Sequence, residues 1–325
     1  MTIIARRRVL ALPAALLAAP ALAQGFPTQP ITMVIPFAAG GPTDTVGRLI
    51  AEAMARDLGQ SVIVVNVGGA GGTLGAQRVA QARPDGHTIL LHHIGMATIP
   101  TLYRRLAYDP VNGFETIGMV TEVPMTLVAR RDFPAQTLQE LVAHVRRERD
   151  RINLANAGIG AASHLCGLLL QSTLNVQMTT VPYNGTGPAM NDLVGGRVDL
   201  MCDQTTNTTE HIRAGTIRAY AATTPARVAS LPDLPTAAEA GLPGFEVSVW
   251  HGLYAPRGTP APVIERLSRA LQVALRDERV VSRFRDLGTE PVPAERATPG
   301  YHRRFWEADI AKWRPIIQAA GTFAD

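Results

Sequence analysis

Short apolar runs alternate along this chain with longer segments in which apolar residues recur every three or four positions. The first run, 31–35, is rich in β-branched residues and predicts a buried parallel strand. The apolar spacing between 46 and 54 predicts a helix that ends before Gly59. The segment 37–44, here called the first glycine loop, joins the two, and the unpaired N–H groups of the helix start form a small anion site.

The same alternation continues toward the C-terminus. Further strands are expected at 61–66, 88–92, 152–155, 217–223 and 245–255 and just before Asp203, and an apolar run lies at 120–128. Helices are expected through 78–82, at 138–150 and 163–170, and from 262 onward. This spacing predicts an α/β fold with mostly parallel sheets covered by helices. Ligands of such sheets bind beyond the carboxyl ends of the strands.

A second unit of strand, glycine loop and helix follows in the middle of the chain. The strand at 152–155 leads into the segment 156–160, here called the second glycine loop, and a helix begins at Ser163. A chain of roughly 300 residues exceeds one comfortable core, so we expect a second domain that faces the first. Two helix N-termini aimed at one cleft would bind an anion.

The N-terminus has the pattern of a secretory signal. Three arginines at 6–8 precede a Leu- and Ala-rich stretch and an Ala-Leu-Ala cleavage motif at 21–23, so we expect residues 1–23 to be removed on export to the periplasm. A membrane anchor is disfavoured because spanning a membrane needs about 20 unbroken apolar residues, and the apolar stretch here is shorter. The arginines leave both the general and the twin-arginine export routes open.

Removing that signal changes the charge balance of the chain. The net charge of +4 comes from 31 basic and 27 acidic residues, and without three arginines the count becomes 28 against 27. The mature chain is therefore nearly neutral, and no basic run with interleaved aromatic residues is present. We expect no nucleic-acid partner and a monomer.

The cysteines and histidines give little sign of a scaffold or a metal site. Cys166 and Cys202 are the only cysteines; they could pair in an oxidising compartment, but we expect buried thiols because two residues make no framework for a chain of this size. Adjacent His92 and His93 should point to opposite faces of their strand and so cannot share a metal ion. We expect no metal. One of the two histidines could face the cleft, with His92 as the candidate site residue; the alternative is a packing or surface role.

Catalytic and cofactor motifs are absent from the sequence. The first glycine loop matches neither G-x-G-x-x-G nor a Walker A loop, so no nucleotide cofactor is expected. Ser163 and His164 are neighbours on a helix and do not face each other, and there is no G-x-S-x-G elbow. We expect a non-enzymatic protein, in which Asp203 either accepts a hydrogen bond from a ligand or caps the next helix.

Six segments in order resemble one family, and together they cover nearly the whole mature chain. They lie at 35–54, 66–90, 156–170, 181–203, 227–260 and 299–321. The family is the Bug or TctC family, the extracytoplasmic solute-binding receptors of tripartite tricarboxylate transporters. The resemblance implies a Venus-flytrap fold of two α/β lobes with a cleft between them. Lobe 1 would comprise 27–125 and 248–325, and lobe 2 would comprise 126–247.

The resemblance also implies a ligand and the residues that hold it. The ligand would be a small carboxylate held by backbone amides and ordered waters, and the protein would deliver it to membrane permease subunits. Carried over residue by residue, the site comprises Phe37, Ala39, Gly40, Gly41, Thr43, Asp44, Asn156, Ala157, Gly158, Ser163 and Asp203. His92 joins them as the candidate from its strand end.

Two departures from the family pattern leave the acid unidentified. Histidines stand at 92 and 93 where the family more often has small or hydroxyl residues, and Asn184 stands where Tyr-Lys-Gly is usual. A histidine at the cleft would make binding depend on pH between about 5 and 8. Two alternatives stay open: a carboxylate receptor that signals to a membrane sensor, and an exported enzyme that acts on a small acid.

Overall fold

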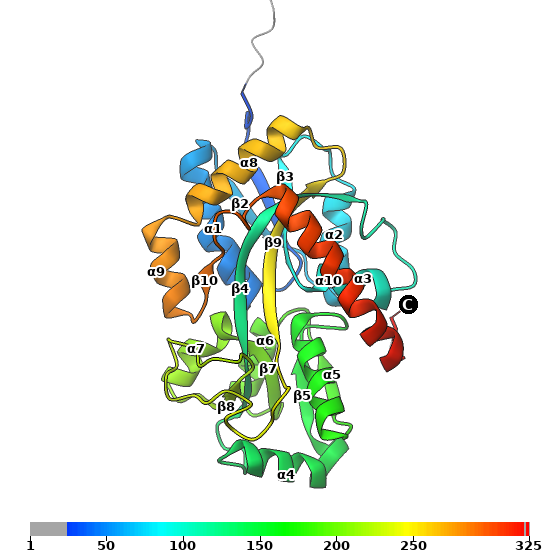
Figure 1. Cartoon of the computed structure of the whole chain (residues 1–325), viewed down its shortest axis with the longest axis vertical. Coiled ribbons are helices and arrows are strands. Elements are labelled where there is room, and N and C mark those ends of the chain that lie inside the picture. Colours follow the sequence, from blue (N-terminus) through cyan, green and yellow to red (C-terminus); the bar gives the residue numbers. More distant parts are fainter. Residues whose placement is uncertain (1–24, 322, 325) are drawn as a thin grey trace, which may run out of the picture.

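The computed structural model describes residues 25–321, 323 and 324, so the expected signal segment lies outside the described residues. The chain forms two α/β lobes, one above the other in Figure 1, and two long strands run between them. This is the expected two-lobed α/β architecture. The sheets are mixed and not mostly parallel, because the two long strands run antiparallel to their neighbours. Across the described residues, no helix is both long enough and apolar enough to cross a membrane.

Lobe 1 is built on a mixed sheet in the order β2-β1-β3-β9-β4. Its strands are β1 (Ile31–Ile35), β2 (Val62–Asn66), β3 (Thr88–His93), β9 (Ser248–Pro256) and the short β10 (Glu290–Pro291). Its helices are α1 (Pro42–Leu58), η1 (Ala70–Gly72), α2 (Thr73–Ala80), α3 (Gly95–Leu102), α8 (Ala261–Ala274), α9 (Glu278–Asp286) and α10 (Pro299–Ala320). The strands β1, β2 and β3 are parallel, and β9 runs antiparallel to β3.

Lobe 2 repeats this plan with fewer strands. Its strands are β5 (Asn153–Asn156), β6 (Thr179–Pro182), β7 (Leu200–Gln204) and β8 (Ile217–Ala222). Its helices are α4 (Leu138–Glu148), η2 (Arg149–Arg151), α5 (Ala162–Leu174), α6 (Thr186–Val194) and α7 (Thr205–Arg213). The strand β5 is parallel to both β6 and β7, so the carboxyl ends of these strands open toward lobe 1.

The strand β4 (Phe114–Arg130) belongs to both lobes. Up to Pro124 it pairs with β9 of lobe 1, and from Met125 it pairs with β7 and β8 of lobe 2. The sequence showed only an apolar run at 120–128. The rest of the strand was missed because register shifts around Gly118 interrupt the regular alternation. The partners of β4 therefore change between Pro124 and Met125, and the boundary between 125 and 126 stays a prediction.

The helix α1 shows how local sequence positions the first glycine loop. Pro42 occupies its first turn, and Gly59 ends it in the left-handed conformation with φ 68°. Val46, Ile50 and Met54 are buried on its sheet-facing side. The strand β1 and the start of α1 are thus both fixed by packing, and the loop between them has little freedom.

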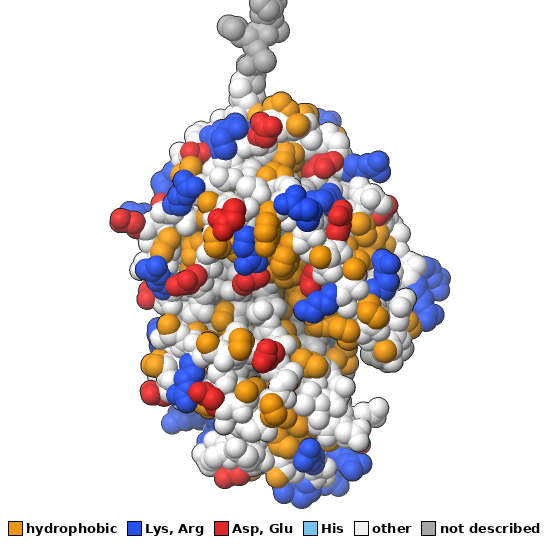
Figure 2. All heavy atoms as spheres, in the orientation of Figure 1, with side chains coloured by type: hydrophobic (Ala, Val, Ile, Leu, Met, Phe, Trp, Pro, Cys, Tyr) orange, Lys and Arg blue, Asp and Glu red, His pale blue; other side chains and the backbone are white. Residues whose placement is uncertain are grey.

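The two lobes carry a mixed surface charge. On the face that Figure 2 shows, basic and acidic side chains are interspersed over both lobes. Inside, the indole N–H of Trp250 donates to Asp309 Oδ2 at 2.8 Å, and that of Trp306 donates to the Met96 carbonyl at 2.9 Å. These two tryptophans therefore hold α10 against β9 and α3.

The expectation of buried free thiols was wrong. Cys166 on α5 and Cys202 on β7 form a disulfide, with their Cα atoms 6.0 Å apart and both side chains fully buried. The helix α5 packs directly on β7, which brings the two Cα atoms into the range that a disulfide needs. Sequence spacing could not show this, because the residues are 36 positions apart.

We expect this disulfide to stabilise lobe 2. For a loop of 36 residues, chain-entropy arguments give a stabilisation of about 4 kcal/mol. A Cys166→Ala, Cys202→Ala double variant should therefore melt several degrees below the wild type, and reducing agent should lower the melting temperature of the wild type only. Equal melting temperatures with and without reductant, together with two titratable thiols in the denatured unreduced wild type, would contradict the disulfide.

Candidate functional site

The two glycine loops meet where the lobes face each other. Three hydrogen bonds cross between the lobes here: Ala38 N–H donates to the Asn184 carbonyl (2.8 Å), the Tyr103 hydroxyl donates to the Ile159 carbonyl (2.9 Å), and the Thr98 hydroxyl donates to the Gly160 carbonyl (3.1 Å). The acceptor of each bond is a backbone oxygen of lobe 2, and the bond from Ala38 N–H joins the two main chains directly. The structure is therefore a closed form.

Glycines permit this close approach. A Cβ atom on Gly71 would lie 1.8 Å from the carbonyl oxygen of Ile159 across the cleft. A Cβ atom on Gly187 would lie 2.7 Å from the carbonyl oxygen of Ala39. Distances below 3.0 Å to backbone atoms cannot be accommodated without moving one lobe. Closure thus depends on the absence of side chains at these positions.

A small cavity remains between the closed lobes, here called the cleft cavity. Its lining residues are Phe37, Pro42, Thr43, His93, Ala157, Ala162, Ser163, Thr186, Asp203 and Gln204. Its volume is about 10 Å³, which corresponds to roughly one water molecule. A carboxylic acid can enter only if the lobes first separate.

Five of the residues expected at the site line this cavity: Phe37, Thr43, Ala157, Ser163 and Asp203. They come from both glycine loops and from the end of β7, as the sequence suggested. The first residues of α1 and α5 also line the cavity. Two helix N-termini from opposite lobes therefore converge on one enclosed space.

Asp44 is another expected residue, and it braces the first glycine loop. Its carboxylate accepts hydrogen bonds from Gly40 N–H (3.0 Å), Arg48 Nε (2.9 Å) and Asn66 Nδ2 (2.9 Å). Burial tends to raise the pKa of Asp44, but the hydrogen bonds, that from Arg48 foremost, hold it below its usual range. Ala39, Gly40 and Gly41 belong to this braced loop, outside the lining of the cavity.

The second glycine loop is held in the same way by its own side chains. The Asn156 Oδ1 atom accepts from Gly158 N–H (2.8 Å), and the Ser163 hydroxyl accepts from Ala157 N–H (2.9 Å). Asn156 and Gly158 therefore shape the loop rather than line the cavity. His164 Nδ1 accepts from Gly160 N–H (3.2 Å), so Ser163 and His164 each bond to the backbone and form no nucleophile and base pair.

The histidines at the end of β3 differ from expectation. His93, and not His92, lines the cleft cavity. Their ring centroids lie 4.9 Å apart rather than on opposite faces, because His93 is the last residue of β3 and the chain turns into helical geometry at Ile94. Burial lowers the pKa of His93 to about 3. The ring is therefore neutral between pH 5 and 8, and the expected titration in that window does not apply to it.

Asp203 lines the cavity and does not cap α7. Its side chain is almost fully buried, and its Oδ2 accepts a hydrogen bond from Asn207 Nδ2 at 2.6 Å. The residue at the N-cap position of α7 is Gln204, which makes no side-chain capping bond. Burial raises the pKa of Asp203 to about 6. The site thus contains a buried, poorly solvated carboxyl group whose pKa, about 6, is close to neutral pH.

The sequence missed five cavity residues: Pro42, His93, Ala162, Thr186 and Gln204. Pro42 and Ala162 are the first residues of α1 and α5, so the predicted helix starts could have identified them as cavity residues. Thr186 begins α6 after another glycine turn, which marks a third helix N-terminus at the cavity. The Gln204 Oε1 atom is buried and has no hydrogen-bond partner within the described residues. The Thr186 side chain interacts with the Asp203 carboxyl group and tends to lower its pKa.

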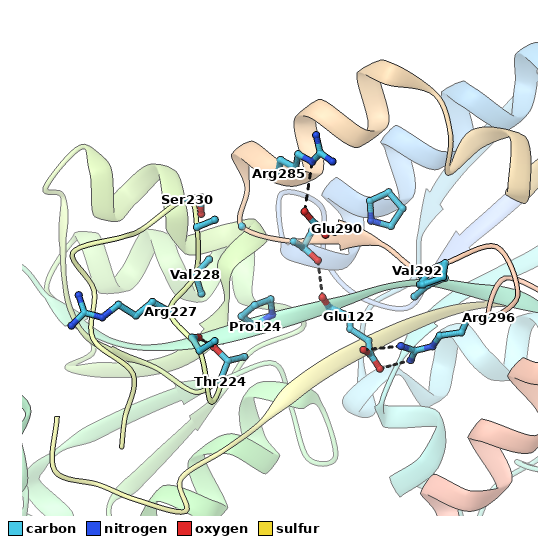
Figure 3. Close-up of a pocket in the computed structure, with 16 residues that line it drawn as sticks. Glu122, Pro124, Thr224, Arg227, Val228, Ser230, Arg285, Glu290, Val292 and Arg296 are labelled. Carbon is cyan, nitrogen blue, oxygen red and sulfur yellow. Dashed lines mark hydrogen bonds and ion pairs between the residues drawn. The ribbon is translucent and has the colours of Figure 1, made fainter. Parts of the chain in front are cut away.

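A larger and more open groove lies elsewhere between the lobes. It has a volume of about 470 Å³ and runs between the segment 224–230 of lobe 2 and the segment 285–296 of lobe 1 (Figure 3). Its charges are paired, as in the contact of Glu122 with Arg296 at 2.5 Å. The groove contains neither glycine loop nor a helix N-terminus, so the cleft cavity is the better candidate site.

Closure can be tested at Gly187, the second residue of α6. Gly187→Ala should hold the lobes apart through the contacts with Ala39 and Gly41 and raise the Kd for a bound acid roughly 10- to 100-fold. Gly300→Ala is the matched control: it is the second residue of α10, where an added Cβ meets only Arg304 at 3.5 Å. Calorimetric titration of both variants checks this, and equal affinities would refute the role of Gly187.

The buried Asp203 should make stability depend on pH. Its pKa rises from 3.8 to about 6 on folding, so its ionisation opposes folding, and stability falls as the pH rises from about 4 to about 6. An Asp203→Asn variant lacks this penalty, so its stability advantage over the wild type should grow by about 2 kcal/mol between pH 4.5 and 7.5. Urea unfolding at several pH values measures this, and a constant difference would contradict it.

Comparisons with known proteins show the family and the fold of this chain. The family described as "Tripartite tricarboxylate transporter family receptor" matches residues 46–322. A protein of Agrobacterium vitis, described as a UPF0065 protein in the TAR-I ttuE-ttuC' intergenic region, is 52% identical over 91% of this chain and 86% of its own length.

Two solved structures are similar in sequence and fold. The periplasmic binding protein BugD is 50% identical with a TM-score of 0.90, over 92% of this chain and all of BugD. MatC from Rhodopseudomonas palustris, solved with bound malate, is 44% identical with a TM-score of 0.87, over 90% of this chain and all of MatC. The protein therefore belongs to the tripartite tricarboxylate transporter receptor family, whose members are periplasmic solute-binding proteins with this two-lobed α/β fold.

Proposed function

We propose that this protein captures a small dicarboxylate in the cleft cavity and delivers it to the permease subunits of a tripartite tricarboxylate transporter. The observation that carries the proposal is the convergence of the α1 and α5 N-termini, from opposite lobes, on one enclosed space. Helix N-termini present unpaired N–H groups and a partial positive charge to an anion. MatC, whose structure contains malate, supports a ligand of this class.

The proposed site holds its anion without a cationic side chain. None of the ten described residues that line the cleft cavity is Lys or Arg. Backbone N–H groups and bridging waters can supply the hydrogen bonds at little loss of affinity. Affinity then depends on closure, because the lobes must come together to bring both helix starts to the ligand. With an acid bound they would close less fully than here, where the cleft cavity holds about 10 Å³.

We infer a hinge at the strands that link the lobes. Residues 27–125 and 248–325 would move as lobe 1 and residues 126–247 as lobe 2, with the hinge where β4 changes partners and β9 begins. A ligand that contacts both lobes binds the closed form more tightly and so shifts the population toward it. That shift would mark the loaded receptor for its permease.

The remaining functional details follow from this proposal. The segment 1–23 would direct export to the periplasm, and the mature protein would act as a monomer. It would bind its acid without converting it, which is supported by the separate backbone bonds of Ser163 and His164. Turnover of a bound acid would favour an exported enzyme, and capture of the loaded form by a sensor ectodomain would favour a signalling receptor.

A ligand screen tests the proposal directly. Mature protein, unfolded and refolded to remove any bound ligand, should be melted with a panel of dicarboxylates, tricarboxylates, amino acids and aromatic acids. A ligand at 100 times its Kd adds about 2.7 kcal/mol of stability, so one small dicarboxylate should raise the melting temperature by several degrees. Small-angle scattering should show compaction with the same acid. A cooperative melt that no acid shifts would refute the dicarboxylate assignment.

A further inference from the structure

His93 is the one histidine in the lining of the cleft cavity. Its ring stacks on Phe37 with centroids 4.5 Å apart and planes inclined by 27°. The side chain is 3% exposed, so the ring has one fixed orientation in a tightly packed wall. The polar atoms that it presents are therefore decided by the structure and not by rotation of the side chain.

The backbone fixes the tautomer of this ring. Gly95 N–H donates to His93 Nδ1 at 2.9 Å. A backbone N–H can only donate, so Nδ1 must be the unprotonated acceptor. Burial lowers the pKa of His93 to about 3, which keeps the ring neutral at pH 7. The single ring proton therefore sits on Nε2, and this atom is a hydrogen-bond donor.

His92 has the same tautomer but a different environment. His93 N–H donates to His92 Nδ1 at 2.8 Å, which leaves the His92 proton on Nε2 as well. That Nε2 is fully buried and unpartnered within the described residues, and a Cβ atom on Gly72 would lie 2.7 Å from it. His92 is thus enclosed by protein. The Nε2 atom of His93 likewise bonds to no described residue, but its ring borders the cavity.

The neighbouring groups leave this donor for a ligand oxygen. The ring of His251 lies 6.0 Å from that of His93, and its Nε2 is engaged with the Thr43 hydroxyl at 3.2 Å. Asp203 is the acidic group in the lining of the cavity, and it comes from lobe 2. Ionised Asp203 would repel a ligand carboxylate. The carboxylate is therefore favoured beside His93, which offers a hydrogen-bond donor and carries no negative charge.

We propose that His93 is a specificity-determining residue, whose Nε2–H donates to a carboxylate oxygen of the bound acid and so orients that carboxylate toward lobe 1 and away from Asp203. This inference rests on the proposed function and adds the residue that selects the orientation. Because the Nε2–H donor is neutral, it selects an oxygen acceptor by the position of that oxygen and not by charge attraction. An ammonium group placed there would face the N–H and lose affinity.

Two substitutions test the roles of the two ring nitrogens of His93 separately. In His93→Asn the side-chain oxygen can still accept from Gly95 N–H, but no atom reaches the Nε2 position. In His93→Gln the amide nitrogen reaches the Nε2 position and can still donate. His92→Asn is the matched control, since it keeps an acceptor for His93 N–H and removes a ring that does not line the cavity.

The experiment measures the Kd of these variants by calorimetry for malate, or for whichever acid of the screen binds the wild type. His93→Asn should raise the Kd roughly 10- to 100-fold, as expected for a lost hydrogen bond to a charged group. His93→Gln should lose less than His93→Asn, and His92→Asn should stay within about threefold of the wild type. A merely structural role would predict the opposite order for Asn and Gln at position 93.

NMR of the histidine ring nitrogens adds a measurement of the tautomer, which a change in packing alone would not alter. The unliganded wild type should show the proton of His93 on Nε2, and the acid should shift the Nε2 resonance more than that of Nδ1. A proton on Nδ1, or wild-type affinity in His93→Asn, would overturn the inference while the proposed function stands. Failure of every acid to bind the wild type would instead refute the proposed function, and the inference with it.

Discussion

The approach of the two lobes, main chain to main chain, is the constraint on which the site depends. The carbonyls of Asn184, Ile159 and Gly160 in lobe 2 all accept hydrogen bonds from lobe 1. Backbone segments of the two lobes also pack directly on each other, which requires positions without side chains, such as Gly71 in lobe 1 and Gly187 in lobe 2. The glycine loops therefore place helix N-termini at the cavity, and glycines outside these loops, at 71 and 187, let the lobes close over it.

Closure alone would not make a selective site, and the polar groups around the cavity are fixed before any ligand arrives. Asp44 holds the first glycine loop through three hydrogen bonds, and Asn156 and Ser163 hold the second. His93, at the end of β3, is locked by the Gly95 N–H. Preorganisation of this kind reduces the ordering that a ligand must bring about on binding.

The candidate site was only partly readable from the sequence. Glycine loops and helix starts are local patterns, so Phe37, Thr43, Ala157 and Ser163 could be chosen from them and do line the cavity. The choice between His92 and His93 failed because strand alternation stops where the strand ends. Thr186 and Gln204 had no distinctive local signal, and they reach the cavity only because lobe 2 folds their elements toward lobe 1.

The sequence by itself determined the class of fold and most of the elements. The strand at 31–35 has the expected bounds, and α1 ends at the expected Gly59 cap, because local periodicity and capping decide them. The start of α1 at Pro42, inside the predicted loop, was not fixed in this way. Contacts between distant segments were decided by the tertiary structure alone. These include the disulfide from Cys166 to Cys202, the sharing of β4 by both lobes, and the tautomer of His93. Each depends on atoms that are brought together only when the chain folds, and no local pattern records their positions.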